Sequence, residues 1–410
     1  MQSQYLYVVG KADSRSTVVD TIHSKGFRAG ILVDEHANTS GSDSFDRVIE
    51  VDFSQIDSEI QRLDNIGLSP SGFLCTYENY IVAKAKLCLH FKTPGISVES
   101  AKLTTDKALM REALLAAEPS ISPDYAKVDT LEEALGFAKN HSFPLIIKPT
   151  NLVKSLLVLR CDNEKELTER FSYAINNVKS LYDKYNVYDQ HPQLIIEEFI
   201  SGQQYSIAAY IDQHGTPYFY EGIADLKTAK DIGKDDTYLF SRTLPAVLSA
   251  DKRAEMFNVA EKGIRSLRLR STPAHIELIS GAAGTKIVEI GARTGGYRPR
   301  MYRMSYGADL AEQEVRIALS EEPSTNSSFE SFCAVYELFP DAEGTFTAIE
   351  HGLDISSLAY FRVTVRPGDR VGPAKNGFKA AAIVIAKDAD EEKFKKICRQ
   401  IEQARVEVSV

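Results

Sequence analysis

Residues His275–Arg293 read HIELISGAAGTKIVEIGAR and carry the strongest structural signal in the chain. Two apolar runs with alternating side chains flank a glycine-rich turn at 281–285. This pattern predicts a β-hairpin. Because strand side chains alternate between faces, each run can direct one carboxylate to a common site, Glu277 from the first strand and Glu289 from the second.

These two glutamates predict a metal site. A carboxylate inside an apolar strand is costly to bury unless a cation compensates its charge. Mg²⁺, or Mn²⁺ in its place, takes one or two protein carboxylates and completes its coordination with nucleotide phosphates and water. The alternative is an exposed hairpin whose glutamates face solvent. The guanidinium groups that follow favour the metal site, because they bind phosphate or carboxylate with two prongs; they belong to Arg293, Arg298, Arg300 and Arg303.

Composition narrows the class of protein. At 410 residues the chain exceeds one ordinary hydrophobic core, so two or three domains are expected. Its 43% apolar and 26% charged residues are typical of soluble globular proteins. A net charge of −9 argues against nucleic acid or an anionic membrane as the main partner and leaves small-molecule substrates.

The cysteines and the apolar runs indicate a compartment. Five scattered cysteines without a CxxC pair predict neither a disulfide framework nor a zinc site. The N-terminus lacks a signal pattern, and no apolar run has the length of a membrane span. A cytoplasmic protein is therefore expected.

The first region, 1–94, alternates strands with helices, which predicts a parallel sheet with Rossmann-like winding and an α/β fold class. The GxGxxG fingerprint is absent after the first strand, so no dinucleotide site is predicted. Strands are expected at 6–9, 29–33, 48–51 and 73–75, and helices at 16–25 and along the stripe Ile56, Ile60 and Leu63.

The second region, 95–330, contains the hairpin and several further elements. Residues 104–107 offer N-cap candidates for a helix whose inward residues are expected to be Leu109, Ala113, Ala116 and Ala117. Thr130 and Glu133 form a capping box. Strands are expected at 144–149, 156–159, 193–199 and 205–211, and a helix at 254–267. The last region, 331–410, reads as a small α+β cap that ends in a helix at 390–403.

A pair of lysines extends the pattern beyond the hairpin. Lys107 begins a helix. Lys148 ends a run of apolar residues, and a lysine in such surroundings is poorly explained as a solvated surface charge. With the hairpin, this pair resembles the ATP-grasp superfamily and its amino-acid ligases, in which two such lysines hold the nucleotide phosphates. The resemblance implies a pre-ATP-grasp domain at 1–94, an ATP-grasp domain at 95–330 and the C-terminal cap. As a buried unpaired lysine, Lys148 is expected to contribute little to stability.

The segment Glu197–Gly202 reads EEFISG and matches the hinge that the family presents to adenine. The resemblance implies that backbone groups of Glu197, Glu198 and Ile200 read the adenine edge while Phe199 and Ile200 line its faces. Gln204 stands where the family places a ribose-binding glutamate, so a neutral ribose contact, or none, is expected. The alternative is an ordinary buried strand with a glutamate at each edge.

The chain departs from the family at two further places. Gly291 stands where the family often has asparagine, which removes one ligand oxygen. The loop over the phosphates, 150–157, contains no glycine, although bare backbone amides are the usual anion nest. Side chains are expected to donate to the phosphates instead, from Asn151, Lys154 and Ser155.

The resemblance implies an ATP-dependent carboxylate–amine ligase that acts through an acylphosphate and releases ADP and phosphate. Lys107, Lys148 and the metal would neutralise phosphate charge, and Arg293 would stabilise the oxyanion of amide formation. The carboxylate and amine substrates are expected to be amino acids or similar molecules. Substrate contacts are expected from Arg298, Arg300, Arg303 and Glu78.

Three questions stay open at the level of sequence. The chain could be a nucleotide-binding module without ligase activity, which the departures at Gln204, Gly291 and the loop would favour. It could also be a carboxylase or a purine-pathway ligase, although no biotin or bicarbonate site is visible. A homodimer is compatible with this class of enzyme.

Overall fold

The computed structural model describes residues 4–12, 17–36, 41–152, 156–185, 187, 191–234 and 238–409. The candidate phosphate-loop residues Lys154 and Ser155 lie outside these ranges. No helix within them is long and apolar enough to cross a bilayer.

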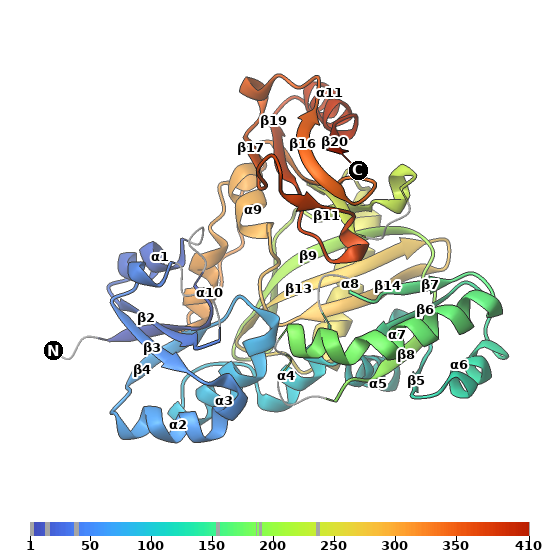
Figure 1. Cartoon of the computed structure of the whole chain (residues 1–410). Coiled ribbons are helices and arrows are strands. Elements are labelled where there is room, and N and C mark those ends of the chain that lie inside the picture. The colour runs from blue at the N-terminus through green and yellow to red at the C-terminus, as the bar shows by residue number, and fades with distance from the viewer. Residues whose placement is uncertain are drawn as a thin grey trace.

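The N-terminal region is a four-stranded parallel sheet, which confirms the predicted Rossmann-like winding (Figure 1). The strands lie in the order β3-β2-β1-β4, where β1 is Tyr5–Gly10, β2 is Arg28–Asp34, β3 is Arg47–Val51 and β4 is Pro70–Leu74. Its helices are α1 (Val18–Ser24), α2 (Ile56–Asn65) and α3 (Ile81–Phe91), and α4 (Val98–Thr105) follows shortly after residue 94. Of these, α3 and α4 have no counterpart among the expected elements.

A second sheet of four antiparallel strands carries Lys148 and the hinge. Its order is β5-β8-β6-β7, with β5 Tyr125–Val128, β6 Leu145–Pro149, β7 Leu159–Cys161 and β8 Leu194–Glu198. Helices α6 (Leu131–Ala138) and α7 (Glu164–Lys184) share one hydrophobic core with this sheet. The capping box of Thr130 and Glu133 is present at the start of α6. The strand expected at 156–159 starts later than predicted, because β7 begins at Leu159.

The largest sheet has nine strands and contains the predicted hairpin, β13 and β14. Its order is β14-β13-β9-β11-β12-β15-β19-β17, with β10 paired to β9. The bounds are β9 Gln203–Ile211, β10 Pro217–Phe219, β11 Ala224–Thr228, β12 Leu239–Leu244, β13 Thr272–Gly281, β14 Gly284–Gly291, β15 Phe332–Leu338, β17 Tyr360–Val363 and β19 Ala382–Asp388. Because β12 pairs with β15, the sheet runs through the proposed domain boundary at residue 331.

The remaining helices and strands border this sheet. They are α5 (Lys107–Ala117), α8 (Ala250–Ser266), α9 (Arg298–Tyr306), α10 (Leu310–Ala318) and α11 (Glu391–Glu402), with a small sheet ordered β18-β16-β20 from Arg370–Val371, Gly344–Glu350 and Arg405–Ser409. In Figure 1 the C-terminal elements stand at the top, and the N-terminal sheet lies at the lower left.

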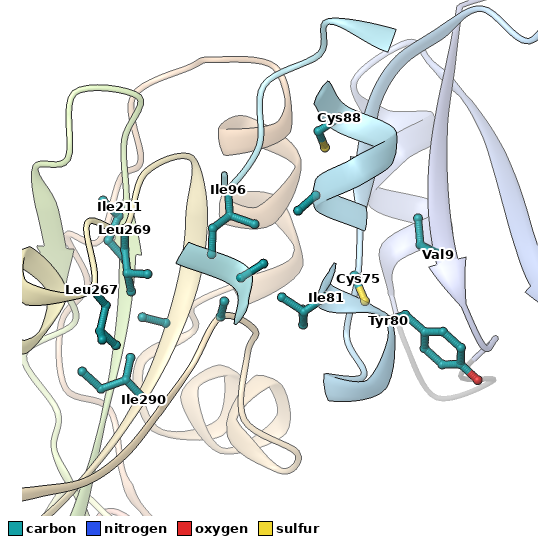
Figure 2. Close-up of a cluster of buried hydrophobic side chains, with 14 of the residues drawn as sticks. Val9, Cys75, Tyr80, Ile81, Cys88, Ile96, Ile211, Leu267, Leu269 and Ile290 are labelled. Atoms are coloured by element: carbon teal, nitrogen blue, oxygen red, sulfur yellow. The ribbon is translucent and has the colours of Figure 1, made fainter. Parts of the chain in front are cut away.

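One hydrophobic core joins the N-terminal region to the hairpin. It contains Tyr80 and Ile81 from the first region together with Ile211, Leu269 and Ile290 from the central sheet and its flanks. Figure 2 shows Ile96 between these two groups. This shared core packs the N-terminal region against the hairpin, and Glu78, at the start of the 3-10 helix Glu78–Tyr80 before α3, reaches the hairpin face.

Candidate active site

The hairpin places the two predicted metal carboxylates opposite each other. Glu277 of β13 pairs with Glu289 of β14, and directly opposed residues of an antiparallel pair project from the same face. Leu278 then pairs with Ile287, so Val288 is the extra residue of a β-bulge. Bulges redirect side chains at functional sites, and this one immediately precedes Glu289.

Both oxygens of Glu277 have hydrogen-bonding neighbours within the protein. His275 Nε2 lies 3.1 Å from Oε1, and Gln204 Nε2 donates to Oε2 at 3.0 Å. Burial opposes ionisation, but the hydrogen bond with His275 and the nearby charges of Arg298 and Arg293 lower the pKa of Glu277 to about 2. The carboxylate is thus ionised and oriented. Gln204, which was expected near the ribose, directs its amide to Glu277.

Lys107 connects Glu289 to the segment after β6. Its ammonium lies 3.4 Å from Glu289 Oε1 and donates to the carbonyl of Leu152 at 3.0 Å. Asp106 caps α5 by accepting from two backbone amides, which fixes where the lysine leaves the helix. Two oriented carboxylates beside a lysine suit Mg²⁺ or Mn²⁺ shared with nucleotide phosphates.

Glu78 reaches this face from the N-terminal region. Arg293 Nε donates to Glu78 Oε2 at 2.6 Å, and Oε1 is buried without a hydrogen-bond partner in the part of the chain that is described. Burial raises the pKa of Glu78, the charge of Glu289 adds to this effect, and Arg293 opposes it. A Cβ at residue 291 would lie 3.0 Å from Glu78 Oε2, so Glu78 crowds the place where the family often has asparagine.

Lys148 belongs to a buried triad with Glu197 and Arg111. Its ammonium lies 2.5 Å from Glu197 Oε1, and Arg111 Nε donates to Glu197 Oε2 at 3.0 Å. The expectation that Lys148 is unpaired was therefore wrong. Burial lowers the pKa of Lys148 to about 8, although Glu197 counteracts part of the shift. The Glu197 side chain is committed to these two cations, and its backbone lies within β8, between β5 and β6.

Helix α5 buries a different face from the expected one. Lys107, Met110, Arg111 and Leu114 are buried, whereas Ala116 and Ala117 are exposed. Hydrophobic periodicity assigns charged side chains to the solvent-facing side of a helix. In α5, however, Lys107 pairs with Glu289 and Arg111 pairs with Glu197, so both cations can be buried. Arg111 was missed for this reason. The available signal was its spacing of four residues from Lys107 on one helical face.

The hinge after β8 packs against the hairpin turn. Added Cβ atoms would lie 2.3 Å from Ser280 O at Gly202 and 2.1 Å from Ser201 O at Gly281, so glycine is required at both positions. The other hinge residues lie nearby. Glu198 accepts from Asp124 N at 3.1 Å, Phe199 lies under the guanidinium of Arg160 at 4.5 Å, and Ile200 is half-buried.

Asn151 does not extend freely toward a phosphate position. Its amide donates to Thr105 O at 3.0 Å, and its oxygen accepts from Tyr182 at 3.1 Å. The side chain thereby fastens the segment after β6 to the turn before α5. The expectation that Asn151 replaces a glycine amide finds no support in these contacts.

The structure separates the three later arginines. Arg298 is buried and donates to Ser206 Oγ at 3.0 and 2.5 Å, and it forms no ion pair with a described carboxylate. Burial, with the charge of Arg242, lowers its pKa to about 10. Arg300 lies over the ring of Tyr360 at 4.5 Å. Arg303 is exposed and pairs with Asp309 at 3.2 Å, so it does not join the group around the hairpin.

Comparisons with known proteins agree with this geometry. Residues 141–299 match the family model described as an ATP-grasp domain. The chain is 25% identical over 338 residues to the protein y4rH of Sinorhizobium fredii, a match covering 80% of this chain and 66% of y4rH. It is 25% identical over 253 residues to alanine–anticapsin ligase of Bacillus subtilis, a match covering 57% of this chain and 51% of the ligase. The chain thus spans about half the length of that ligase.

A solved structure extends the likeness to the whole fold. An L-amino acid ligase from Bacillus licheniformis superposes with a TM-score of 0.80 at 17% identity, covering 100% of both chains. The resemblance inferred from the sequence motifs is confirmed. Residues 141–299 match an ATP-grasp domain, and the chain as a whole shares the fold of this L-amino acid ligase.

Proposed function

We propose that this protein is an ATP-dependent carboxylate–amine ligase that forms an amide or peptide bond through an acylphosphate and releases ADP and phosphate. The observation that carries the proposal is the opposed pair Glu277 and Glu289, with Lys107 beside Glu289 and the charge of Arg293 close to both carboxylates. The amino-acid ligases among the similar proteins support amino acids or related molecules as substrates.

The nucleotide would lie between the hinge and the hairpin, which meet at Gly202 and Gly281. Lys107 and Lys148 would hold its phosphates. Mg²⁺ or Mn²⁺ on Glu277 and Glu289 would neutralise charge on the outer phosphates during transfer to the substrate carboxylate. The protein's main tasks are then to position the reactants and to keep water out.

Arg293 and Glu78 would serve the second step. The incoming amine attacks the acyl carbon, and the guanidinium stabilises the oxyanion that forms before phosphate leaves. The buried oxygen Glu78 Oε1 is available to accept a hydrogen bond from that amine. Arg298 has no described carboxylate partner, which suits a contact with the carboxylate of a substrate.

The test is a screen of amino-acid pairs with ATP and Mg²⁺, in which ADP and phosphate are quantified and products are identified by mass spectrometry. A ligase requires both substrates for rapid phosphate release and yields a new amide. Formation of AMP and pyrophosphate would contradict the acylphosphate route. Nucleotide binding without amide formation across the screen would favour a module without ligase activity, and phosphate release that depends on bicarbonate would favour a carboxylase.

A further inference from the structure

Arg111 is a fully buried cation that joins two parts of the candidate site. It lies within α5 with no exposed surface. Nε donates to Glu197 Oε2 at 3.0 Å, and Nη2 donates to Val288 O at 2.8 Å. Glu197 in turn contacts the ammonium of Lys148 at 2.5 Å.

The contact with Val288 is informative because Val288 is the bulged residue of the hairpin. A bulge leaves backbone groups outside the regular ladder of hydrogen bonds, and Arg111 donates a hydrogen bond to the carbonyl of Val288. Glu289 follows Val288 directly. The guanidinium of Arg111 therefore contacts both the backbone next to Glu289 and the side chain of Glu197, which pairs with Lys148.

The arrangement is not one that stability alone would favour. Arg111 Nη1 is buried without a hydrogen-bond partner in the described part of the chain. An unsatisfied buried donor costs about 1–3 kcal/mol. Buried ion networks are also often no more stable than apolar packing of the same volume. Both arguments point to a role for Arg111 in arranging the site.

We propose that Arg111 is a positioning residue that locks the phosphate-binding lysine, through Glu197, to the bulge that orients the metal-binding hairpin. The proposal rests on the proposed ATP site, because its benefit is the fixed spacing between Lys148 and Glu289. Substitution of Arg111 should therefore disturb nucleotide binding even where the charge of Lys148 is preserved.

The triad has an electrostatic signature that can be measured. The pKa of Lys148, about 8, is lowered by burial and by the charges of Arg111 and Lys107, and is raised by Glu197. Removing Arg111 should raise this pKa, and removing the charge of Glu197 should lower it. The ammonium is present below the pKa, so phosphate binding should weaken as the pH rises through the titration of Lys148. These shifts report the coupling of charges within the triad, and the ADP affinity of Arg111→Lys, which keeps the charge, reports the positioning role.

The experiment compares the parent with Arg111→Met, Arg111→Lys and Glu197→Gln. In nucleotide-free protein, the titration of Lys148 is followed by NMR of lysine labelled with carbon-13 at Cε, and Lys148→Arg assigns the signal. ADP affinity with Mg²⁺ is measured by calorimetry at a pH below the titration midpoint of Lys148 in the parent and in every variant. We expect Arg111→Met to shift the midpoint upward and Glu197→Gln to shift it downward. Arg111→Lys keeps the charge but loses the forked contact, so ADP should bind about tenfold more weakly.

Arg62 provides a matched control far from the site. Like Arg111, it donates to a glutamate side chain, that of Glu59, and to a backbone carbonyl, that of Glu50. Arg62→Lys should leave ADP affinity unchanged. Parent-like ADP affinity in Arg111→Lys, or midpoints that do not move in opposite directions, would overturn this inference alone. A parent protein that binds no adenine nucleotide would overturn the proposed function as well. Arg111→Lys keeps the question decidable if Arg111→Met does not fold.

Discussion

The candidate site combines two charged regions that differ in burial. In the triad, the side chains of Arg111, Glu197 and Lys148 are 1%, 5% and 5% exposed, and one carboxylate is shared by two cations. On the hairpin face, Glu277 and Glu289 are 21% and 29% exposed. The charged groups of one candidate site thus differ in their surroundings, because the triad is enclosed by the protein and the hairpin carboxylates are partly open to solvent.

The largest effect is expected from removing the anion of the triad. Glu197→Leu would leave two buried cations without their partner, so the free energy of unfolding should fall by about 3–5 kcal/mol. Urea denaturation measures it. Glu59→Leu, which removes the partner of the exposed Arg62 side chain, should cost at most about 1 kcal/mol. Equal losses in the two variants would remove the distinction between the triad and an ordinary ion pair.

The hairpin face should respond in activity more than in stability. Glu277→Gln and Glu289→Gln each preserve shape and remove one charge. We expect ATP-dependent turnover to fall roughly a hundredfold or more, because the loss amounts to several kcal/mol of transition-state stabilisation. Phosphate release at saturating Mg²⁺ is the measurement. Near-normal turnover in either variant would show that the carboxylate does not bind a catalytic metal.

Arg293→Lys separates nucleotide binding from amide formation. A lysine keeps the charge but cannot make a two-pronged contact with an oxyanion and the leaving phosphate. We expect ADP affinity close to that of the parent and amide formation reduced by about tenfold to a hundredfold. Mass spectrometry of the product alongside phosphate release measures both. Amide formation at the parental rate would exclude this role for Arg293.

The smallest effect should come from Gln204, which orients Glu277 without joining the proposed metal site. Gln204→Met removes the donor to Glu277 Oε2 and keeps most of the side-chain volume. Groups that orient a metal ligand typically change metal affinity by at least tenfold, so the Mg²⁺ concentration for half-maximal turnover should rise about tenfold. Should the Mg²⁺ requirement stay unchanged while the KM for ATP rises, the expected ribose contact would be the better explanation.

Much of the local structure could be predicted from the sequence. The hairpin was expected from two alternating runs around a glycine turn, and β13 and β14 confirm it. The parallel N-terminal sheet and the capping box at Thr130 were also correct. These features depend on residues that are close in sequence, whose periodicity and turn chemistry are visible without a tertiary structure.

The partners of the charged residues could not be predicted in the same way. Arg111 and Glu197 are 86 residues apart, and Arg293 and Glu78 are 215 residues apart. Neither pair leaves a periodic pattern in the chain. The face of α5 was misassigned for the same reason, since a buried lysine and a buried arginine are stable only beside carboxylates supplied by distant strands.

The sequence by itself therefore determined the parallel N-terminal sheet, the hairpin and the pair of carboxylates that it opposes. Only the tertiary structure decided that Glu197 neutralises Lys148, that Glu78 meets Arg293 and that Gln204 orients Glu277. The physical reason is the range of the interactions. Backbone periodicity is a local property, whereas the compensation of a buried charge depends on which distant element the fold brings within hydrogen-bonding distance.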